Sequence, residues 1–96
     1  MQAEWQVPAD HPAFAGHFPG RPIVPGVVLL DRVLWMAGRE RGSTGWAVAQ
    51  AKFLRPVAPA EMLVFRLTDT PRGALGFEIR CGDELVATGV LQQEVR

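Results

Sequence analysis

The distribution of prolines sets the strongest limit on how this chain can fold. Residues 8–25 contain five of them, namely Pro8, Pro12, Pro19, Pro22 and Pro25. Proline fixes φ and lacks a backbone N–H, so this density excludes regular helix or strand over the segment. After the Pro25–Gly26 pair the next breaker is Gly38, and the residues between are mostly apolar. We therefore expect a loop over 8–25 followed by a helix over about 26–38.

The expected helix is apolar on nearly every side. Almost no polar stripe is left by its residues Val27, Val28, Leu29, Leu30, Val33, Leu34, Trp35 and Met36. A helix of this kind is usually enclosed by other elements instead of lying on a surface. We expect a sheet that curls around it.

Strand signals account for most of the remaining chain. A short strand is expected over 3–7, and four more over 46–54, 61–69, 74–81 and 84–95. Within 61–69 the residues alternate, with Leu63, Phe65 and Leu67 on one face and Met62 and Val64 on the other. The links "RPVAPA", "TPRG" and "GD" have turn chemistry, and short links predict antiparallel pairing of successive strands. The fold class is therefore α+β, with one central helix and an antiparallel sheet of about five strands.

Composition limits the classes of protein that remain. A chain of 96 residues suits one domain spanning 1–96, and its 48% hydrophobic content favours self-association. A formal net charge of zero argues against a broad nucleic-acid surface, and no apolar run is long enough to cross a membrane. The sequence shows no targeting segment, and its one cysteine, Cys81, suits a reducing compartment. We expect a soluble cytoplasmic protein.

Two titratable residues stand out near the expected helix start. Asp31 shares a helix face with Val27 and Leu34, where a carboxylate must be paired, hydrogen-bonded or protonated. It could instead pair with Arg32 or reach solvent. His17 lies in the "GHFPG" loop, where a histidine is more often a turn residue than a base.

The local design favours a chemical role for these two residues. The Pro25–Gly26 pair leaves the first N–H groups of the helix free to face a ligand. A histidine, a helix N-terminus and an acid together can polarise a carbonyl and move a proton beside it. No metal site is expected, because His11, which we interpret as a loop residue, and His17 lack a third ligand at useful spacing.

The stretch "GHFPGRPIVPGVVLLD", residues 16–31, resembles the signature of the 3-hydroxyacyl-acyl-carrier-protein dehydratases, which have the hotdog fold. In that family a histidine precedes Phe-Pro-Gly, a Pro-Gly pair starts the central helix, and an acid lies two turns into it. The segment "KFLRPVAPAEML", residues 52–63, resembles a second family stretch. The likeness is greatest to the short dehydratase-like members of specialised lipid or aryl-polyene pathways.

The resemblance implies a reaction and a role for each residue. The substrate would be a (3R)-3-hydroxyacyl thioester on an acyl carrier protein, dehydrated to the trans-2-enoyl thioester without metal or redox cofactor. His17 would remove the C2 proton, the Gly26 N–H would bind the thioester oxygen, and Asp31 would protonate or orient the departing hydroxyl. Phe18, Pro25 and Val27 would also contact the substrate. In the family the tunnel lies between two subunits, so we expect a homodimer, with a heterodimer possible.

Some residues depart from the family pattern. The acid is Asp31, as in the branch that also isomerises its product, whereas the commoner branch has Glu. Arg32 and Trp35 stand where the family has a small residue and a glutamine. Arg32 and Trp35 therefore keep open the alternative of a non-catalytic acyl-thioester-binding subunit of a dehydratase complex. A hotdog thioesterase is the other alternative, and the "HFPG" loop argues against it.

The expected carrier partner is acidic in this family. Residues 1–58 hold six basic against four acidic residues, so this part of the chain is mildly positive. Arg21 follows the His17 loop and Arg55 lies in the "RPV" turn. These two arginines are therefore the predicted carrier-docking residues at the tunnel mouth.

Overall fold

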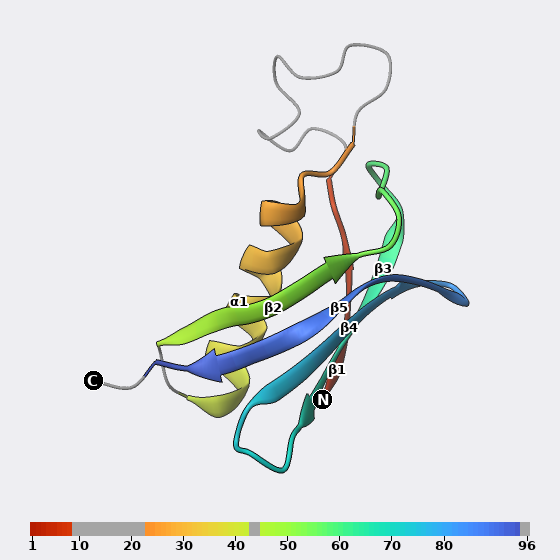
Figure 1. Cartoon of the computed structure of the whole chain (residues 1–96). Helices are drawn as coiled ribbons and strands as arrows, with labels where there is room; N and C mark the ends of the chain where they lie inside the picture. The colour runs from red at the N-terminus through yellow and green to blue at the C-terminus, as the bar shows by residue number, and fades with distance from the viewer. Residues whose placement is uncertain (9–22, 43–44, 95–96) are drawn as a thin grey trace.

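The structure is a computed structural model that describes residues 1–8, 23–42 and 45–94. In chain order its elements are β1 (Gln2–Gln6), α1 (Gly26–Arg41), β2 (Trp46–Phe53), β3 (Met62–Asp69), β4 (Leu75–Cys81) and β5 (Glu84–Gln93). The five strands form one antiparallel sheet that curves past the helix (Figure 1). The predicted α+β class, with one helix and five strands, is confirmed.

Some strands that follow one another in the sequence are not neighbours in the sheet. It runs β1-β3-β4-β5-β2, which makes β1 and β2 the two edges. The links after β3 and β4 close hairpins, as predicted, with Gly73 at φ 79° and Gly82 at φ 59°. The predicted pairing across "RPVAPA" is wrong, because β2 pairs with β5 while β3 pairs with β1 and β4. That link contains Pro56 and Pro59, which cannot donate a backbone N–H to a hairpin, and it carries the chain from the β2 edge of the sheet to β3, which lies between β1 and β4.

Helix α1 begins where the sequence predicts and ends later. It starts at Gly26, directly after Pro25, but continues through Gly38 to Arg41. A glycine inside a helix costs only about 1 kcal/mol, which the burial of Met36 and Ala37 beside it can offset. The helix ends where Gly42 adopts the left-handed conformation, at φ 64°.

The sheet covers one side of the helix. Leu29, Val33, Met36 and Ala37 are buried against the inward face of the sheet, so one face of the helix belongs to the core, and its last turn does not. On the opposite side Val27 is 62% exposed and Trp35 is 47% exposed. The expectation that the helix is fully enclosed is therefore wrong for the single chain. Five strands wrap one face of α1 and leave an apolar face open.

The core lies between this helix face and alternate residues of the sheet. The predicted alternation in β3 is confirmed, since Leu63, Phe65 and Leu67 are buried while Met62 is exposed. The central strands contribute the other large core residues, which include Leu75, Phe77, Ile79, Val86 and Leu91.

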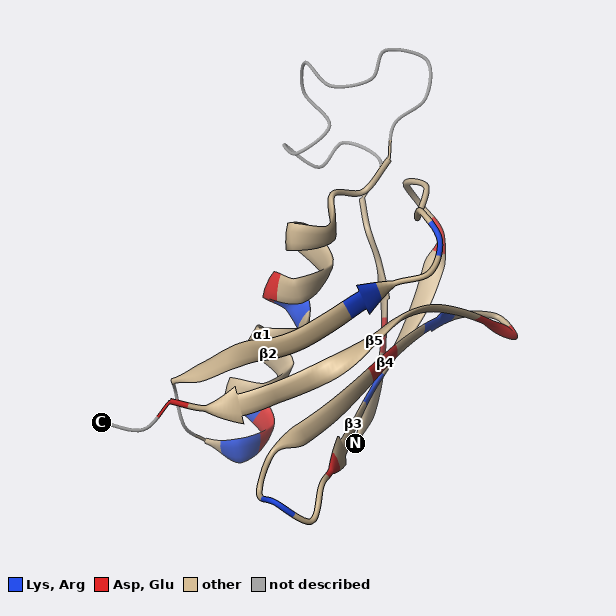
Figure 2. Cartoon of the chain, viewed as in Figure 1, with Lys and Arg blue, Asp and Glu red and all other residues tan. Residues whose placement is uncertain are grey.

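Charged residues are spread over the helix, the strands and the turns without gathering on one element (Figure 2). In the described part of the chain, no helix combines the length and the apolar character needed to cross a membrane.

Candidate functional site at the start of the helix

The start of α1 presents backbone N–H donors that no described residue accepts. Pro25 precedes the helix in an extended conformation, at φ −60° and ψ 142°, and has no side chain that could cap it. The Val28 N–H donates to the Pro25 carbonyl oxygen at 3.0 Å. The N–H groups of Gly26 and Val27 come earlier than the first intrahelical bond and have no acceptor among the described residues, so they can face a ligand. This end of the helix dipole is also positive and favours developing negative charge.

A cavity of about 530 Å³ opens beside this helix start. It is lined by residues of two segments, namely Val24, Gly26, Leu29, Phe53, Leu54, Arg55, Pro56 and Val57. A Cβ on Gly26 would lie 2.9 Å from Cζ of Phe53, so glycine lets this ring approach the first turn closely. The Val24 N–H donates to the Val57 carbonyl oxygen at 2.8 Å, which joins the two segments.

Asp31 lies on the outward face of the helix. The residues one turn before and after it, Val27 and Trp35, are exposed, and Asp31 is exposed as well. It stands about 7.5 Å along the helix axis from Gly26. In the single chain Asp31 is therefore open to solvent, and its place in a tunnel between two subunits stays a prediction. Asp31 forms no ion pair with Arg32.

Asp31 also borders an open groove of about 960 Å³. The other residues lining it are Leu34, Trp35, Gly38, Arg39, Gly42, Gly45 and Trp46. Two tryptophans therefore stand near the acid. The indole Nε1 of Trp46 is buried without a hydrogen-bond acceptor among the described residues.

The two unusual residues next to Asp31 belong to an aromatic–cationic stack. The Arg32 guanidinium lies 4.8 Å from the ring centre of Trp5 and 4.1 Å from that of Trp35. The Arg39 guanidinium lies 5.1 Å from the Trp35 ring centre. Such contacts fix the orientation of the indole. Sequence reasoning singled out Arg32 and Trp35 but missed the stack, because Trp5 comes from the distant strand β1.

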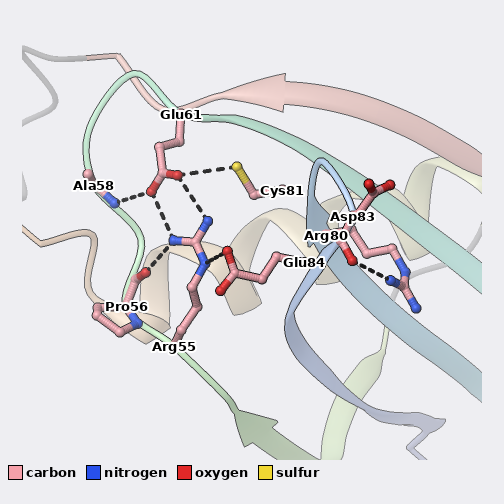
Figure 3. A network of polar contacts seen from close by, with 8 residues as sticks. All are labelled: Arg55, Pro56, Ala58, Glu61, Arg80, Cys81, Asp83 and Glu84. Carbon is pink, nitrogen blue, oxygen red and sulfur yellow. Dashed lines mark hydrogen bonds and ion pairs between the residues drawn. The ribbon is translucent and has the colours of Figure 1, made fainter.

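Arg55 forms two ion pairs within the chain (Figure 3). Its Nη1 and Nη2 donate to the two carboxylate oxygens of Glu61 at 3.1 and 3.0 Å. Its Nε lies 3.2 Å from Oε1 of Glu84, close enough for an ion pair although not aligned as a hydrogen bond. Two carboxylates thus face one guanidinium. The predicted docking role of Arg55 stays a prediction.

Glu61 is a residue that sequence reasoning missed. Hydrogen bonds from Arg55, and then from the Ala58 N–H, lower the pKa of Glu61 from its usual 4.5 to about 2. The Cys81 thiol donates to the same carboxylate at 3.2 Å, and this hydrogen bond to an anion raises the pKa of Cys81. The available signal was an acid six residues after Arg55 at the start of a strand, but only the fold shows that the two meet.

Several predicted residues lie outside the described part of the chain. They are His11, His17, Phe18 and Arg21. The meeting of His17 with Asp31 therefore stays a prediction, whereas Pro25, Gly26 and Val27 are brought together at the helix start. Within residues 1–8, 23–42 and 45–94, no group of three metal-ligating side chains occurs.

One helix on a curved five-stranded antiparallel sheet, with strand order β1-β3-β4-β5-β2, defines a hotdog-fold protein. A family model for the ApeI-like proteins, described as ApeI dehydratase, matches residues 1–90. The chain belongs to this ApeI-like dehydratase family.

Curated relatives support the same assignment. The 3-hydroxyacyl-acyl-carrier-protein dehydratase FabZ of Chlamydia trachomatis is 33% identical over 104 residues, covering 93% of this chain and 68% of that protein. The FabZ of Allorhizobium ampelinum is 29% identical over 98 residues, covering 93% and 64%. The chain thus spans about two thirds of the length of these relatives.

Solved structures confirm the fold. A chain of the dehydratase heterocomplex ApeI:P from Xenorhabdus doucetiae superposes with a TM-score of 0.75 at 24% identity, covering 95% of this chain and 83% of that one. The fluoroacetyl-CoA thioesterase FlK superposes with a TM-score of 0.64 at 14% identity, covering 95% and 80%. A dehydratase and a thioesterase share this architecture, so the fold alone does not select the reaction.

Proposed function

We propose that this chain dehydrates a (3R)-3-hydroxyacyl thioester carried by an acyl carrier protein, in the cytoplasm and in the context of fatty-acid, polyketide or aryl-polyene biosynthesis. The products are the trans-2-enoyl thioester and water. Membership of a dehydratase family is the observation that carries the proposal. The geometry supports it, because α1 begins with N–H donors that have no acceptor among the described residues and carries an exposed acid in its second turn.

Each step has a proposed residue. His17 takes a proton from C2 of the substrate, and the electrons move onto the thioester oxygen. The Gly26 N–H, at the positive end of the helix dipole, stabilises that enolate oxygen. Asp31 gives its proton to the C3 hydroxyl, which leaves as water as the C2–C3 double bond forms. Phe18, Pro25 and Val27 line the acyl path.

We further propose that two chains form the working unit. Asp31 and the exposed face of α1 need a cover that excludes water from the reaction. Exposed apolar side chains surround the helix start, namely Ile23, Val27, Phe53 and Leu54, and the β2 edge beside them has free pairing positions. A second copy of the chain would bury them and would bring His17 of one subunit to Asp31 of the other.

A second candidate is a subunit that binds the acyl thioester and acts only with a different partner chain. The observation that favours it is the likeness to a chain from a dehydratase heterocomplex. The Trp5–Arg32–Trp35 stack beside Asp31 also favours it, because Arg32 and Trp35 stand where the family has a small residue and a glutamine.

The carrier is the proposed macromolecular partner, with Arg21 and Arg55 as docking residues. Glu61 and Glu84 balance the charge of Arg55. Arg21 should therefore contribute more than Arg55 to the electrostatic attraction between this chain and the acidic carrier.

A turnover assay on the purified chain tests the proposed reaction. We expect a 3-hydroxyoctanoyl thioester on a phosphopantetheinylated carrier to lose one water and gain an enoyl group, observed by mass spectrometry. His17→Ala and Asp31→Asn should each lower kcat at least about 100-fold, because each removes a proton-transfer group. Unchanged circular dichroism shows that these variants still fold.

The same assay separates the alternatives. Release of the free carrier thiol would indicate a thioesterase. Absence of any reaction by the chain alone, with reaction restored by a second chain, would indicate the non-catalytic subunit. Turnover near the unmodified level in either variant would contradict the residue assignment.

A further inference from the structure

The connection between β2 and β3, residues 54–61, is closed on itself by one carboxylate. Glu61 accepts the Ala58 N–H at 2.8 Å and both terminal nitrogens of Arg55 at 3.1 and 3.0 Å. Arg55 Nη1 also donates to the Pro56 carbonyl oxygen at 2.7 Å. Val57, which is 2% exposed, lies in the middle of this closed loop. The Arg55–Glu61 pair therefore fixes the backbone on both sides of Val57.

This closed loop is also attached to the β4–β5 hairpin. The Cys81 thiol at the end of β4 donates to Glu61, and Glu84 at the start of β5 pairs with Arg55 (Figure 3). The Leu54 N–H donates to the Val86 carbonyl oxygen at 2.8 Å. The hairpin belongs to the middle of the sheet, so the connection is held against a rigid part of the molecule.

The loop in turn holds the segment that leads into the helix. The carbonyl oxygen of Val57 accepts the Val24 N–H at 2.8 Å, and Val24 is two residues before Gly26. Both segments line the same 530 Å³ cavity at the helix start. A series of short contacts thus runs from the hairpin, through Glu61, Arg55 and Val57, to Val24 and the first turn of α1.

We propose that Arg55 and Glu61 are positioning residues, which set the direction of the Gly26 and Val27 N–H groups by fixing the Val57 carbonyl oxygen. This role rests on the proposed function, in which the Gly26 N–H stabilises the enolate oxygen. Neither side chain needs to touch the substrate. An oxyanion donor works only when it points to where the charge develops, so a small rotation of the first turn reduces the rate.

Glu84 provides a matched control. It pairs with the same guanidinium, but its side chain is 66% exposed, whereas the hydrogen bonds to the backbone of 54–61 are made by Arg55 and Glu61. Glu84→Gln therefore removes the same charge as Glu61→Gln and leaves the closed loop intact.

The first measurement is hydrogen–deuterium exchange, which does not depend on activity. We expect Glu61→Gln to speed exchange of amides in residues 24–30 about tenfold, with β4 amides as the internal reference for overall stability. Glu84→Gln should leave residues 24–30 unchanged. Exchange that rises equally in β4 would show a general loss of stability and would overturn the positioning role. Unchanged exchange at residues 24–30 would overturn it as well.

The second measurement is steady-state kinetics on 3-hydroxyoctanoyl-N-acetylcysteamine, a carrier-free thioester. We expect Glu61→Gln to lower kcat about tenfold with KM within about twofold, because the defect lies in the transition state. Arg55→Gln should give the same loss, and the double variant should lose no more than either single one. Additive losses, or an equal loss in Glu84→Gln, would contradict the proposal.

The two measurements keep the proposals separate. A wild-type chain with no turnover would refute the proposed reaction, and the exchange experiment alone would then decide whether the pair orients the helix start.

Discussion

Ala60 has a backbone conformation that an L-residue rarely adopts. Its φ is 69°, and its N–H donates to the Val7 carbonyl oxygen at 3.0 Å. In this region the Cβ crowds the following carbonyl, at a cost of about 1–2 kcal/mol. The contact between the 54–61 connection and the segment after β1 therefore keeps Ala60 in a strained state.

Relieving this strain should stabilise the protein. We expect Ala60→Gly to raise the free energy of unfolding by about 0.5–1 kcal/mol, since the lost strain exceeds the extra chain entropy of glycine. Urea unfolding followed by circular dichroism measures the change. Ala58→Gly in the same connection is the control, and it should be neutral or destabilising. A lower stability of Ala60→Gly would show that the strain is absent.

Gly89 lies where the backbone of β2 and the ring of Phe77 leave no room for a Cβ. A Cβ there would lie 2.2 Å from the Gln50 carbonyl oxygen and 2.5 Å from the Phe77 ring. The pairing of β2 with β5 shifts register beside it, between Val48 and Gln50. Glycine at this position lets the edge strand β2 bend over the core.

Adding one methyl group at this position should therefore be costly. We expect Gly89→Ala to lower the free energy of unfolding by at least about 2 kcal/mol, because a backbone carbonyl and a core ring must both move. Gly76→Ala is the matched control in β4, where the new Cβ would meet its nearest atom, the Thr68 carbonyl oxygen, at 3.7 Å. Equal losses of stability in the two variants would contradict this explanation.

At the scale of the elements, the 54–61 connection makes stability depend on pH. Glu61 has its pKa lowered from 4.5 to about 2, first by the hydrogen bond from Arg55. A lowered folded-state pKa gives stability that is fully present above the unfolded pKa and is lost as pH falls through the folded one. The contribution of Glu61 should therefore be complete above about pH 5 and should disappear towards pH 2.

The test is acid and urea unfolding of Glu61→Gln beside the unmodified chain. We expect the variant to be less stable by about 1–2 kcal/mol at pH 7, allowing for partial solvent screening. The difference should shrink towards zero as pH falls from 5 to 2. A difference that stays constant over this range would show that packing of Glu61, and not its charge, stabilises the connection.

The elements also show which predictions a sequence can support. Periodicity and breakers located the helix start and all five strands, because these depend on neighbouring residues. The helix end was placed at Gly38 and not at Gly42, since the choice depends on which glycine has positive φ. The pairing of β2 with β5 depends on contacts between residues about forty positions apart, and no local turn signal encodes it.

In the candidate site, too, features set by neighbouring residues could be predicted, and features set by distant contacts could not. The helix start at Pro25–Gly26 was predicted correctly because it depends on neighbouring residues, and the role of Asp31 stays a prediction from the same contiguous motif. The exposure of Asp31 depends on how much of α1 the sheet covers, and the Arg55–Glu61 contact depends on how the connection closes. Both are consequences of the assembled fold, so they could not be derived from spacing.

At the scale of the whole molecule, the open face of α1 leads to a prediction about assembly. If each active site combines His17 of one subunit with Asp31 of the other, two inactive variants should complement each other. We expect a mixture of His17→Ala and Asp31→Asn proteins, after subunit exchange, to regain up to about one quarter of unmodified activity. This fraction follows because half of the chains pair as heterodimers and each heterodimer has one intact site of two.

Subunit exchange is verified by native mass spectrometry of a labelled and an unlabelled chain. No recovery after demonstrated exchange would place both residues of a site in one chain.

The strand order has a consequence for biosynthesis. Among the described strands, β2 pairs with β5 alone and β1 pairs with β3 alone. The residues of β1 pair with residues more than fifty positions further along the chain, as Gln2 does with Arg66. Both edges of the sheet therefore depend on segments that leave the ribosome later, and the β3–β4–β5 meander is the part with local pairing. During translation the apolar helix and β2 are exposed until β5 has emerged. Non-local pairing of this kind slows folding, so we expect α1 to be the part of the nascent chain most exposed to aggregation over that interval.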